Sequence, residues 1–358
     1  MNGSGTVVIP EATQDRPVRN VLVIGGAGYV GSVTIGSLLN RGFAVTVMDA
    51  LMYGDDSIRD YHGREGFSVV KGDLRSVEDI VRASKGADAI VHLGALVGDP
   101  ACAHDETLAR AVNLDATRTV ASVARGLGIS RLLFASTCGV YGASEGLLDE
   151  DSPLDPVSVY SRTKQESEDI LLSQPSEGFA PTILRFGTFF GPSKRPRFDL
   201  VVNELVAKAL REGEVTIFGG DQWRPFLHVA DGADAIVACL EAPTDVVGYR
   251  VYNVGSDAEN HTLAELGRLV VEAVPGSTLT VGPAASVEAN YRVSFKRIRE
   301  ELGFLAPRTL AQGICELRDE LELGGIGDHD DPRYSNIKSL QVADATAAPS
   351  LQLAGGAA

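Results

Sequence analysis

The chain has 358 residues, of which 44% are hydrophobic and 22% are charged, and its formal net charge is −16 at pH 7. This length and composition predict a globular protein with a large core and more than one subdomain. The acidic balance argues against a nucleic-acid partner, because such binding depends on clustered positive charge.

The cysteines and the N-terminal segment exclude further classes of protein. The four cysteines form no CxxC pair and no cluster with histidines, so neither a metal site nor a disulfide framework is expected. No apolar run approaches the ~20 residues that a membrane-spanning helix needs. Residues 1–17 lack the basic start and apolar centre of a signal peptide and are expected to form a flexible arm. We therefore expect a cytoplasmic protein without a membrane partner.

From residue 18 the sequence alternates between predicted strands and predicted helices. Strands are expected at 21–24, 45–48, 67–70, 89–93, 131–135 and 182–186, and helices at 30–40, 106–127 and 159–172. This alternation predicts an α/β fold with a Rossmann-type, doubly wound parallel sheet. Residues 18–191 are expected to form this domain, with 225–260 returning to it. The ligand is then expected at the carboxyl ends of the strands.

After Gly191-Pro192 the pattern changes. Helices are expected at 198–211, 263–274 and 294–302, with a short strand at 215–218. Segments 192–224 and 261–326 are expected to form a smaller α/β C-terminal subdomain that binds the substrate, while 225–229 and 233–240 rejoin the main sheet and its flanking helix. From residue 327 the chain becomes polar and then rich in Ala, Gly and Ser, which predicts a largely flexible tail over 327–358.

A glycine-rich turn follows the first predicted strand. Gly25, Gly28 and Gly31 have the spacing GxxGxxG and open a helix, a pattern typical of a site where backbone approaches a dinucleotide pyrophosphate closely. Asp49, at the end of the second strand, can accept hydrogen bonds from ribose hydroxyls and would repel a 2′-phosphate, which favours NAD over NADP. Asp73, after the third strand, is interpreted either as a ligand of the adenine amine or as a turn residue.

A second motif predicts proton transfer. Tyr160 and Lys164 are four residues apart on a predicted helix, so both side chains share one face. An ammonium beside a phenol is expected to lower the tyrosine pKa from about 10 towards neutrality. Thr137, at the end of the fifth predicted strand, offers a hydroxyl that can hold or relay a substrate proton. Together with the glycine motif, these residues predict a redox-competent enzyme.

This set of motifs resembles the extended short-chain dehydrogenases/reductases, in their nucleotide-sugar epimerase/dehydratase group. The matching segments follow the order of the family over about residues 18–325: 25–31, 49, 72–75, 92–95, 113, 136–142, 160–164, 184–192 and 224–231. The resemblance implies that Thr137, Tyr160 and Lys164 do the chemistry with bound NAD. It implies a cofactor site formed by Gly25, Gly28, Tyr29, Val30, Gly31, Asp49, Asp73, Leu74, Leu93, Gly94, Ala95, Tyr160 and Lys164.

The same resemblance implies a nucleoside-diphosphate sugar as substrate, in contact with Thr137, Thr188, Arg197 and Arg224. The basic cluster Lys194, Arg195 and Arg197 is interpreted either as a diphosphate ligand or as a solvated loop. Asn113 is implied to stabilise the active-site helix, with an ordinary helical asparagine as the alternative, and His228 is interpreted as structural. The family also implies a homodimer formed through helices near 106–127 and 158–172.

The two residues after Thr137 bear on the reaction. By resemblance, dehydratases carry an Asp-Glu pair there and decarboxylases a Glu at the second position, whereas this chain has Cys138 and Gly139. The missing carboxylates favour a 4-epimerase that works through a transient 4-keto sugar. The alternatives are an NAD(P)H-dependent reductase of 4-keto nucleotide sugars, less readily a dehydratase, and a catalytically silent NAD-binding regulator. Cys138 is interpreted as a small packing residue, and a chemical role for its thiol stays open.

Overall fold

The structure, a computed structural model, describes residues 17–173, 176, 178–284, 290–324 and 328–347. Residues 1–16 of the predicted flexible arm (1–17) and the last part of the predicted tail, 348–358, lie outside the described residues. Within the described part of the chain, no helix combines the length and apolar character needed to cross a membrane.

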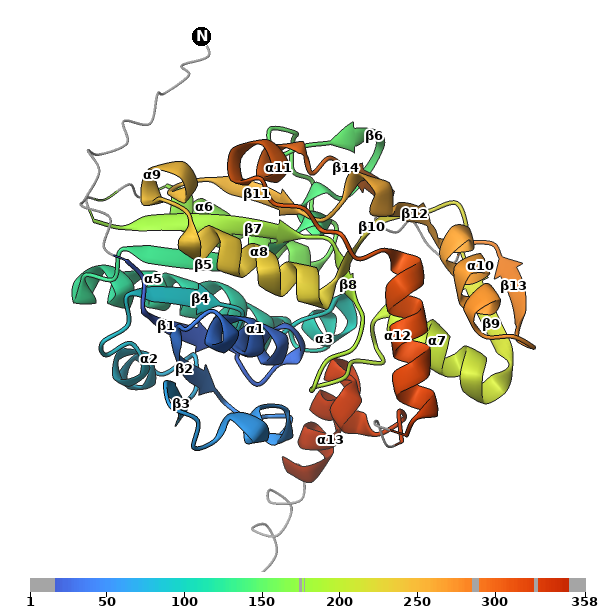
Figure 1. Ribbon diagram of the computed structural model, residues 1–358, viewed down its shortest axis with the longest axis horizontal. Coiled ribbons are helices and arrows are strands. Elements are labelled where there is room, and N and C mark those ends of the chain that lie inside the picture. The colour runs from blue at the N-terminus through green and yellow to red at the C-terminus, as the bar shows by residue number, and fades with distance from the viewer. Residues whose placement is uncertain (1–16, 174–175, 177, 285–289, 325–327, 348–358) are drawn as a thin grey trace, which may run out of the picture.

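A seven-stranded parallel sheet forms the centre of the larger part of the molecule (Figure 1). Its strands are β1 (Asn20–Ile24), β2 (Ala44–Asp49), β3 (Phe67–Lys71), β4 (Ala89–His92), β5 (Arg131–Thr137), β7 (Ala180–Phe186) and β11 (Val251–Val254). They lie in the order β11-β7-β5-β4-β1-β2-β3. This arrangement confirms the predicted Rossmann-type fold. The strand order reverses between β1 and β4, and open α/β sheets bind ligands at such a switch point.

Helices cover both faces of this sheet. α1 (Tyr29–Asn40) and α8 (Val229–Glu241) pack side by side on one face, and α2 (Val77–Ala83), α5 (Ala116–Leu127) and α6 (Val159–Leu172) lie on the other. Strand β1 shows why both faces need cover: Val21 and Val23 belong to the first core cluster, and Leu22 and Ile24 to the second. Alternating side chains point to opposite faces of a strand, so an all-apolar strand is buried on both sides.

The long helix predicted at 106–127 is divided in the structure. It runs from α4 (Glu106–Arg110) through a π-helical turn at Ala111–Asp115 into α5. A short helix that the sequence pattern missed, α3 (Asp99–His104), precedes it. π-turns inside helices occur frequently at functional sites. The turn carries Asn113, whose contacts are described below.

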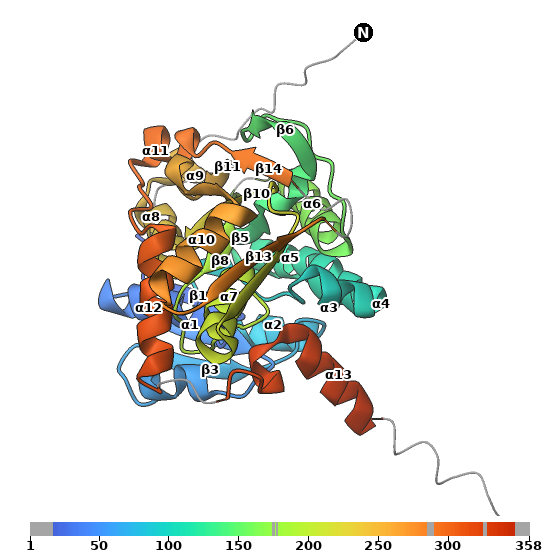
Figure 2. The same cartoon turned by 90° about the vertical axis from the view of Figure 1, so that its right-hand side faces the viewer.

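The smaller part of the molecule packs beside the sheet around a third core cluster (Figures 1 and 2). Its helices are α7 (Val201–Glu212), α10 (Leu263–Ala273) and α12 (Leu310–Glu322). Its strands form the pair β9 (Glu214–Phe218) and β13 (Thr278–Gly282), and a three-stranded sheet of β8 (Thr188–Phe190), β10 (Trp223–His228) and β12 (Asn260–Thr262). The remaining elements are β6 (Ala143–Leu148) paired with β14 (Asn290–Val293), α9 (Thr244–Val247) and α11 (Lys296–Leu302).

Two sequence predictions are wrong. The segment 225–229 does not rejoin the main sheet, because β10 pairs with β12 and β8, and β11 is the strand that extends the main sheet. Pro225 lies in β10, the central strand of that small sheet, where it pairs with Asn260 of β12, and the pairing of β10 with β8 begins only at the next residue, Phe226. The predicted flexible tail is also wrong over 336–347, which form α13 (Asn336–Ala347) after a short turn of 3₁₀ helix, η5 (Pro332–Tyr334). Leu340 of α13 is buried against the larger part, which stabilises this helix.

Candidate active site

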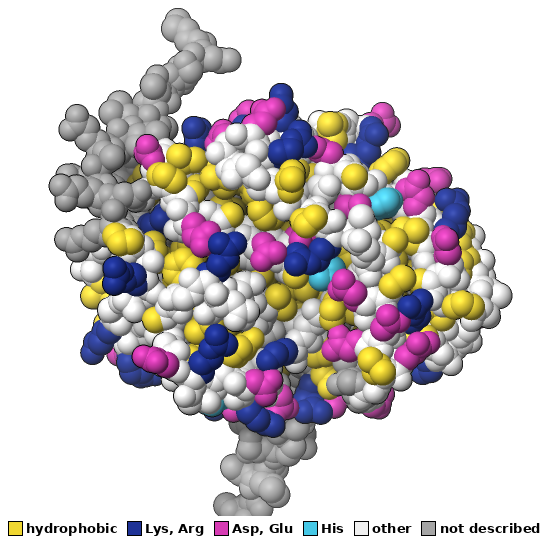
Figure 3. All heavy atoms as spheres, in the orientation of Figure 1, with side chains coloured by type: hydrophobic (Ala, Val, Ile, Leu, Met, Phe, Trp, Pro, Cys, Tyr) yellow, Lys and Arg dark blue, Asp and Glu magenta, His cyan; other side chains and the backbone are white. Residues whose placement is uncertain are grey.

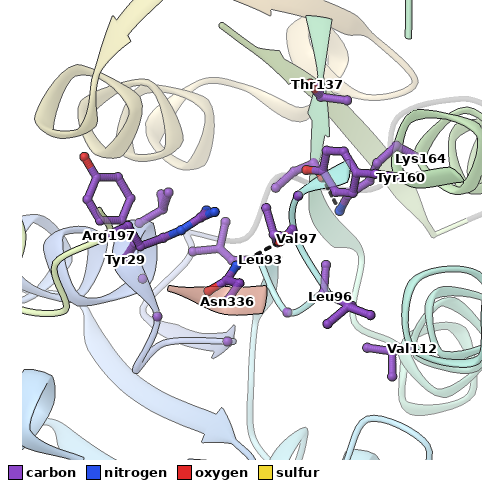
Figure 4. Close-up of a pocket in the computed structure, with 18 of the residues that line it drawn as sticks. Tyr29, Leu93, Leu96, Val97, Val112, Thr137, Tyr160, Lys164, Arg197 and Asn336 are labelled. Atoms are coloured by element: carbon purple, nitrogen blue, oxygen red, sulfur yellow. Dashed lines mark hydrogen bonds between the residues drawn. The ribbon is translucent and has the colours of Figure 1, made fainter. Parts of the chain in front are cut away.

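A cavity of about 1190 Å³ lies at the carboxyl ends of β1, β2, β4 and β5 and reaches across to the smaller part. Figure 4 shows Thr137, Tyr160 and Lys164 on one side of this cavity and Tyr29 and Arg197 on the other. Every site residue predicted from the sequence lines it: Gly25, Gly28, Tyr29, Val30, Gly31, Asp49, Asp73, Leu74, Leu93, Gly94, Ala95, Thr137, Tyr160, Lys164, Thr188, Arg197 and Arg224. Their roles stay predictions, but the fold brings all of them to one place.

The glycine loop has the geometry of a pyrophosphate cradle. Gly25 has a φ of +80°, and a Cβ there would lie 2.6 Å from the backbone nitrogen of Gly94. A Cβ on Gly31 would lie 2.3 Å from the carbonyl oxygen of Gly25. Gly28 is the N-cap of α1 and provides no capping side chain, so the first-turn amides of α1 are available to an anion. The loop therefore fits a dinucleotide.

Asp49 and Asp73 line the part of the cavity where the sequence predicts the adenosine of the cofactor. The Asp49 carboxylate accepts hydrogen bonds from the amides of Ala27 (3.0 Å) and Leu51 (2.8 Å), which fix its orientation. Burial raises the pKa of Asp49, and these two hydrogen bonds oppose the rise. Further lone pairs remain for ribose hydroxyls, since an ionised carboxylate has about four acceptor positions. Asp73 accepts from the guanidinium of Arg75, and this hydrogen bond holds the pKa of Asp73 low.

Lys164 is held at the other end of the cavity. Its Nζ donates to the carbonyl of Ala135 at 2.8 Å and lies 5.8 Å from the centre of the Tyr160 ring. Only 2% of Lys164 is exposed, and this burial lowers its pKa to about 8. Thr137 caps the turn that follows β5, and its Oγ1 accepts from the amide of Gly139 at 3.0 Å.

The expected lowering of the Tyr160 pKa is wrong for the protein chain by itself. Desolvation is the largest influence and raises the pKa of Tyr160 above its ordinary value. The negative charge of Asp99, at the start of α3, adds to that rise. The ammonium of Lys164 donates a hydrogen bond to the backbone of β5 rather than to the phenol of Tyr160. Lys164 is therefore the first of the two side chains to lose its proton as the pH rises.

Asn113 connects the active-site helix to the cofactor loop. Its Oδ1 accepts from the amide of Leu96 at 2.7 Å, and its Nδ2 donates to the carbonyl of Leu96 at 3.0 Å and to Oγ1 of Thr163 at 3.2 Å. Thr163 lies on α6 between Tyr160 and Lys164. This fully paired amide explains the π-turn, which places Asn113 between β4 and α6. The geometry agrees with the role that the family resemblance implied for it.

The residues predicted for the substrate show different environments. Thr188 and Arg224 line the cavity from adjacent strands of the small sheet, and Arg224 lies 5.9 Å from the ring of Tyr291. Arg197 is buried and forms a two-pronged ion pair with Asp199, at 2.9 Å for each contact. Lys194 does not line the cavity and instead pairs with the exposed Asp60.

Two further predictions concern packing. His228 is 3% exposed, bonds Glu316 at 3.0 Å and packs against Phe190, as a structural histidine does. Cys138 is fully buried, its Sγ lies 3.2 Å from the carbonyl of Arg185, and burial raises its thiol pKa. Cys138 does not line the cavity, whereas Gly139 does. The structure therefore gives the thiol a packing environment.

Sequence reasoning missed several residues of the cavity, namely Tyr53, Asp99, Tyr291, Asn336 and Leu340. Tyr291 lies on β14, a strand that the pattern did not predict, and its phenol interacts electrostatically with that of Tyr160. Asn336 and Leu340 lie on α13, in the segment expected to be flexible. Only the apolar spacing of Ile337 and Leu340 signals that helix, and two residues are too few for a prediction.

Comparison with known proteins identifies the family. Residues 21–255 match the family described as "NAD dependent epimerase/dehydratase family". A dTDP-glucose 4,6-dehydratase of Streptomyces griseus is 30% identical over 310 residues, covering 83% of this chain and 92% of its own. A UDP-glucose 4-epimerase of Corynebacterium glutamicum is 28% identical over 321 residues, covering 83% and 93%.

Solved structures of NAD-binding proteins resemble this chain as well. The UDP-glucose 4-epimerase of Thermus thermophilus in complex with NAD superposes with a TM-score of 0.74 at 27% identity, over 85% of this chain and 99% of its own. The family match covers the glycine loop, Asp49 and the Tyr160–Lys164 pair, which together fit a dinucleotide in the cavity described above. The chain therefore belongs to the NAD-dependent epimerase/dehydratase family, and its cofactor is NAD.

Proposed function

We propose that this protein is an NAD-dependent nucleotide-sugar epimerase that inverts C4 through a transient 4-keto sugar. One observation supports this most directly. The cavity brings Tyr160, Lys164 and Thr137 to the cofactor loops, but the positions after Thr137 provide no acid or base. Gly139 has no side chain, and the Cys138 thiol points to the Arg185 carbonyl, outside the cavity. Tyr160, Lys164 and Thr137, together with bound NAD, are sufficient for proton and hydride transfer at one carbon.

In the proposed mechanism, the residues move one proton and hold the sugar. The glycine loop and Asp49 would hold NAD, which would supply the capacity to take up and return the C4 hydride. Tyr160 takes the proton of the C4 hydroxyl, Thr137 holds that hydroxyl, and Lys164 stabilises the phenolate. After the 4-keto sugar has turned over, Tyr160 returns the proton as hydride reaches the opposite face. Arg224 is proposed to hold the diphosphate during the turn.

The dehydratase alternative has one supporting observation, because Asp99 lines the cavity and acts electrostatically on Tyr160. A dehydratase needs an acid and a base for water elimination, and Asp99 is the carboxylate of the cavity that acts on Tyr160 and could provide one of them. We propose instead that Asp99 has no proton-transfer role. Asp99→Asn is then expected to keep epimerase turnover within about threefold, since only a through-space charge is removed. A loss of 100-fold or more, with wild type releasing a 6-deoxy-4-keto product, would favour dehydration.

The direct test compares wild type with Tyr160→Phe on nucleotide sugars. Wild type is expected to interconvert a C4 pair without added cofactor, and Tyr160→Phe to lose about 10²–10⁴-fold in kcat, the usual contribution of general acid–base catalysis. NAD binding by the variant, measured by titration, serves as the control for folding. Equal inertness of both proteins would support the silent-regulator alternative.

A further inference from the structure

The C-terminal segment closes one side of the cofactor cavity. Asn336, Leu340, Ala343 and Asp344 of α13 all line it. Figure 1 shows α13 below the main sheet, and Figure 2 shows it reaching under α3. This segment lies beyond residue 255, where the match to the family ends, so the matched region does not include it.

The segment is anchored to both parts of the molecule. Asn336 donates through its backbone amide to Asp199 at 3.1 Å and through Nδ2 to the carbonyl of Val97 at 2.9 Å (Figure 4). Phe198 donates its backbone amide to the carbonyl of Tyr334 at 2.8 Å. Leu340 packs in an apolar cluster that includes Leu96 and the catalytic-site Tyr160. The segment thus bridges the loop after β4 to the loop before α7.

Two buried polar groups in this region have no partner among the described residues: Nε of Arg195 and Oδ1 of Asn336. Arg195 is 5% exposed and Asn336 is 4% exposed. Arg195 has no carboxylate within ion-pair distance in the described part of the chain, whereas the neighbouring Arg197 is neutralised by Asp199. Burying a cation without a counter-charge is costly, which points to an anion as the missing partner.

The position of Arg195 favours the cofactor over the sugar nucleotide as the source of that anion. Its guanidinium stacks 3.8 Å from the ring centre of Tyr53, and it interacts electrostatically with Asp49. Its loop is bound to the first helix, because Ser193 Oγ donates to the carbonyl of Tyr29 at 2.7 Å. Arg195 therefore lies near Asp49, on a loop that is bound to the first residue of α1 after the glycine loop. A contact from Nη2 of Arg195 to the carbonyl of Arg333, at 3.2 Å, connects it to η5.

We propose that η5 and α13 form a cap that completes the NAD site: the cap holds Arg195 at the pyrophosphate, provides Asn336 Oδ1 as an acceptor for a ribose hydroxyl, and slows release of the dinucleotide. The proposal depends on NAD binding and not on which sugar is the substrate. An epimerase that regenerates its cofactor in each cycle benefits from such retention.

The cap is tested by the rate of cofactor release. NADH-loaded full-length protein is chased with excess NAD, and loss of bound NADH fluorescence is followed. Leu340→Asp is expected to undock α13 and to release NADH at least about tenfold faster, because most affinity changes appear in the dissociation rate. Lys338→Ala, on the same helix at a position exposed to solvent, is the matched control. Asn336→Ala, a milder change, is expected to release severalfold faster. Unchanged release in both folded variants would overturn the cap.

The role of Arg195 is tested by equilibrium binding without sugar. Arg195→Ala is expected to weaken NAD and ADP-ribose alike by about 10–100-fold and to leave adenosine unaffected, as loss of a charged contact to the pyrophosphate requires. Lys194→Ala, the adjacent residue paired with Asp60, is the control, and Arg195→Lys is expected to recover part of the affinity. If affinity for NAD is retained and affinity for a nucleoside-diphosphate sugar is lost, Arg195 belongs to the substrate and the assignment is wrong.

Discussion

At the scale of single residues, burial has more influence than ion pairing on the pKa values of the Tyr160–Lys164 pair. Lys164 and Tyr160 are both desolvated, and desolvation disfavours the charged form of each: the pKa of Lys164 falls to about 8, while that of Tyr160 rises. The pair therefore loses its first proton near pH 8 in the protein alone. Once the Tyr160–Lys164 pair has lost one proton, the pair can accept a proton from a sugar hydroxyl. This holds whether Tyr160 or Lys164 carries the proton that remains.

A pH dependence follows from this shift. With pKa about 8 for the first proton, kcat/KM for a nucleotide sugar is expected to rise with pH up to about 8 and then level off. Lys164→Met removes the group that lets the pair lose its first proton near pH 8, so the rise should move towards the raised pKa of Tyr160. The measurement is a pH–rate profile from 6 to 10 for both proteins. A wild-type rate that falls through pH 8 would contradict this account.

At the scale of elements, the active site is assembled by close backbone approaches and one buried ion pair. The glycine loop joins β1 to α1 at distances that exclude side chains. On the other side, Arg185 of β7 pairs with Glu168 of α6 at 2.7 Å, and Glu168 also accepts from Ser136 at the end of β5. Through these two contacts, Glu168 holds α6, which carries Tyr160, against β5, which carries Thr137.

Gly31→Ala tests the close approach. Its Cβ would meet the carbonyl oxygen of Gly25 at 2.3 Å and the Cα of Gly26 at 2.6 Å, both in the backbone, so the loop has to shift. We expect a loss of about 1–3 kcal/mol in the free energy of unfolding, with weakened NAD binding. Gly126→Ala in α5, where no atom lies within 4 Å, is the control and should be neutral or stabilising by up to about 1 kcal/mol. Urea unfolding measures the free energy of unfolding of both variants. Equal changes in this free energy for Gly31→Ala and Gly126→Ala would contradict the packing argument.

The buried pair gives a second test. Glu168→Gln leaves the Arg185 charge uncompensated where the two side chains are 2% and 5% exposed, so we expect a loss of about 3–5 kcal/mol. Glu241→Gln breaks the Arg41–Glu241 pair, which also joins two elements but is 43% and 61% exposed, and should cost less than about 1 kcal/mol. Thermal and urea unfolding measure both. Similar losses at the two sites would show that burial is not what makes the Arg185 pair important.

The difference between local patterns and contacts made in the folded protein explains what could be predicted from the sequence. The glycine loop, Asp49 and the Tyr160–Lys164 pair are local patterns, and the strand–helix alternation places their ends at one edge of a sheet. The sequence pattern missed β6, β14 and α3, which are short and depend on tertiary partners. It also missed α13, since a helix with two apolar anchors is stabilised by docking on Leu96 and Ala101 rather than by its own pattern. The expected lowering of the Tyr160 pKa is wrong because the burial of Tyr160 depends on tertiary packing, which a local sequence pattern does not show.

At the scale of the whole molecule, two parts enclose one cavity, and three buried cations line it. Arg195, Arg197 and Lys164 line the cavity, whereas the face in Figure 3 carries acidic and basic side chains intermixed. A dinucleotide and a nucleoside-diphosphate sugar are both anionic, so a local cationic site in a chain of net charge −16 fits both. The predicted homodimer, through helices near 106–127 and 158–172, remains a proposal.

The measurement that tests the central proposal most directly is turnover of UDP-, dTDP-, GDP- and CDP-sugars by the protein as purified, without added cofactor, followed by proton NMR. We expect a new anomeric signal from the C4 epimer of one sugar while total sugar stays constant. If every sugar remains unchanged while a 4-keto nucleotide sugar is reduced with NADH, the protein is a reductase and the proposed epimerase function is wrong.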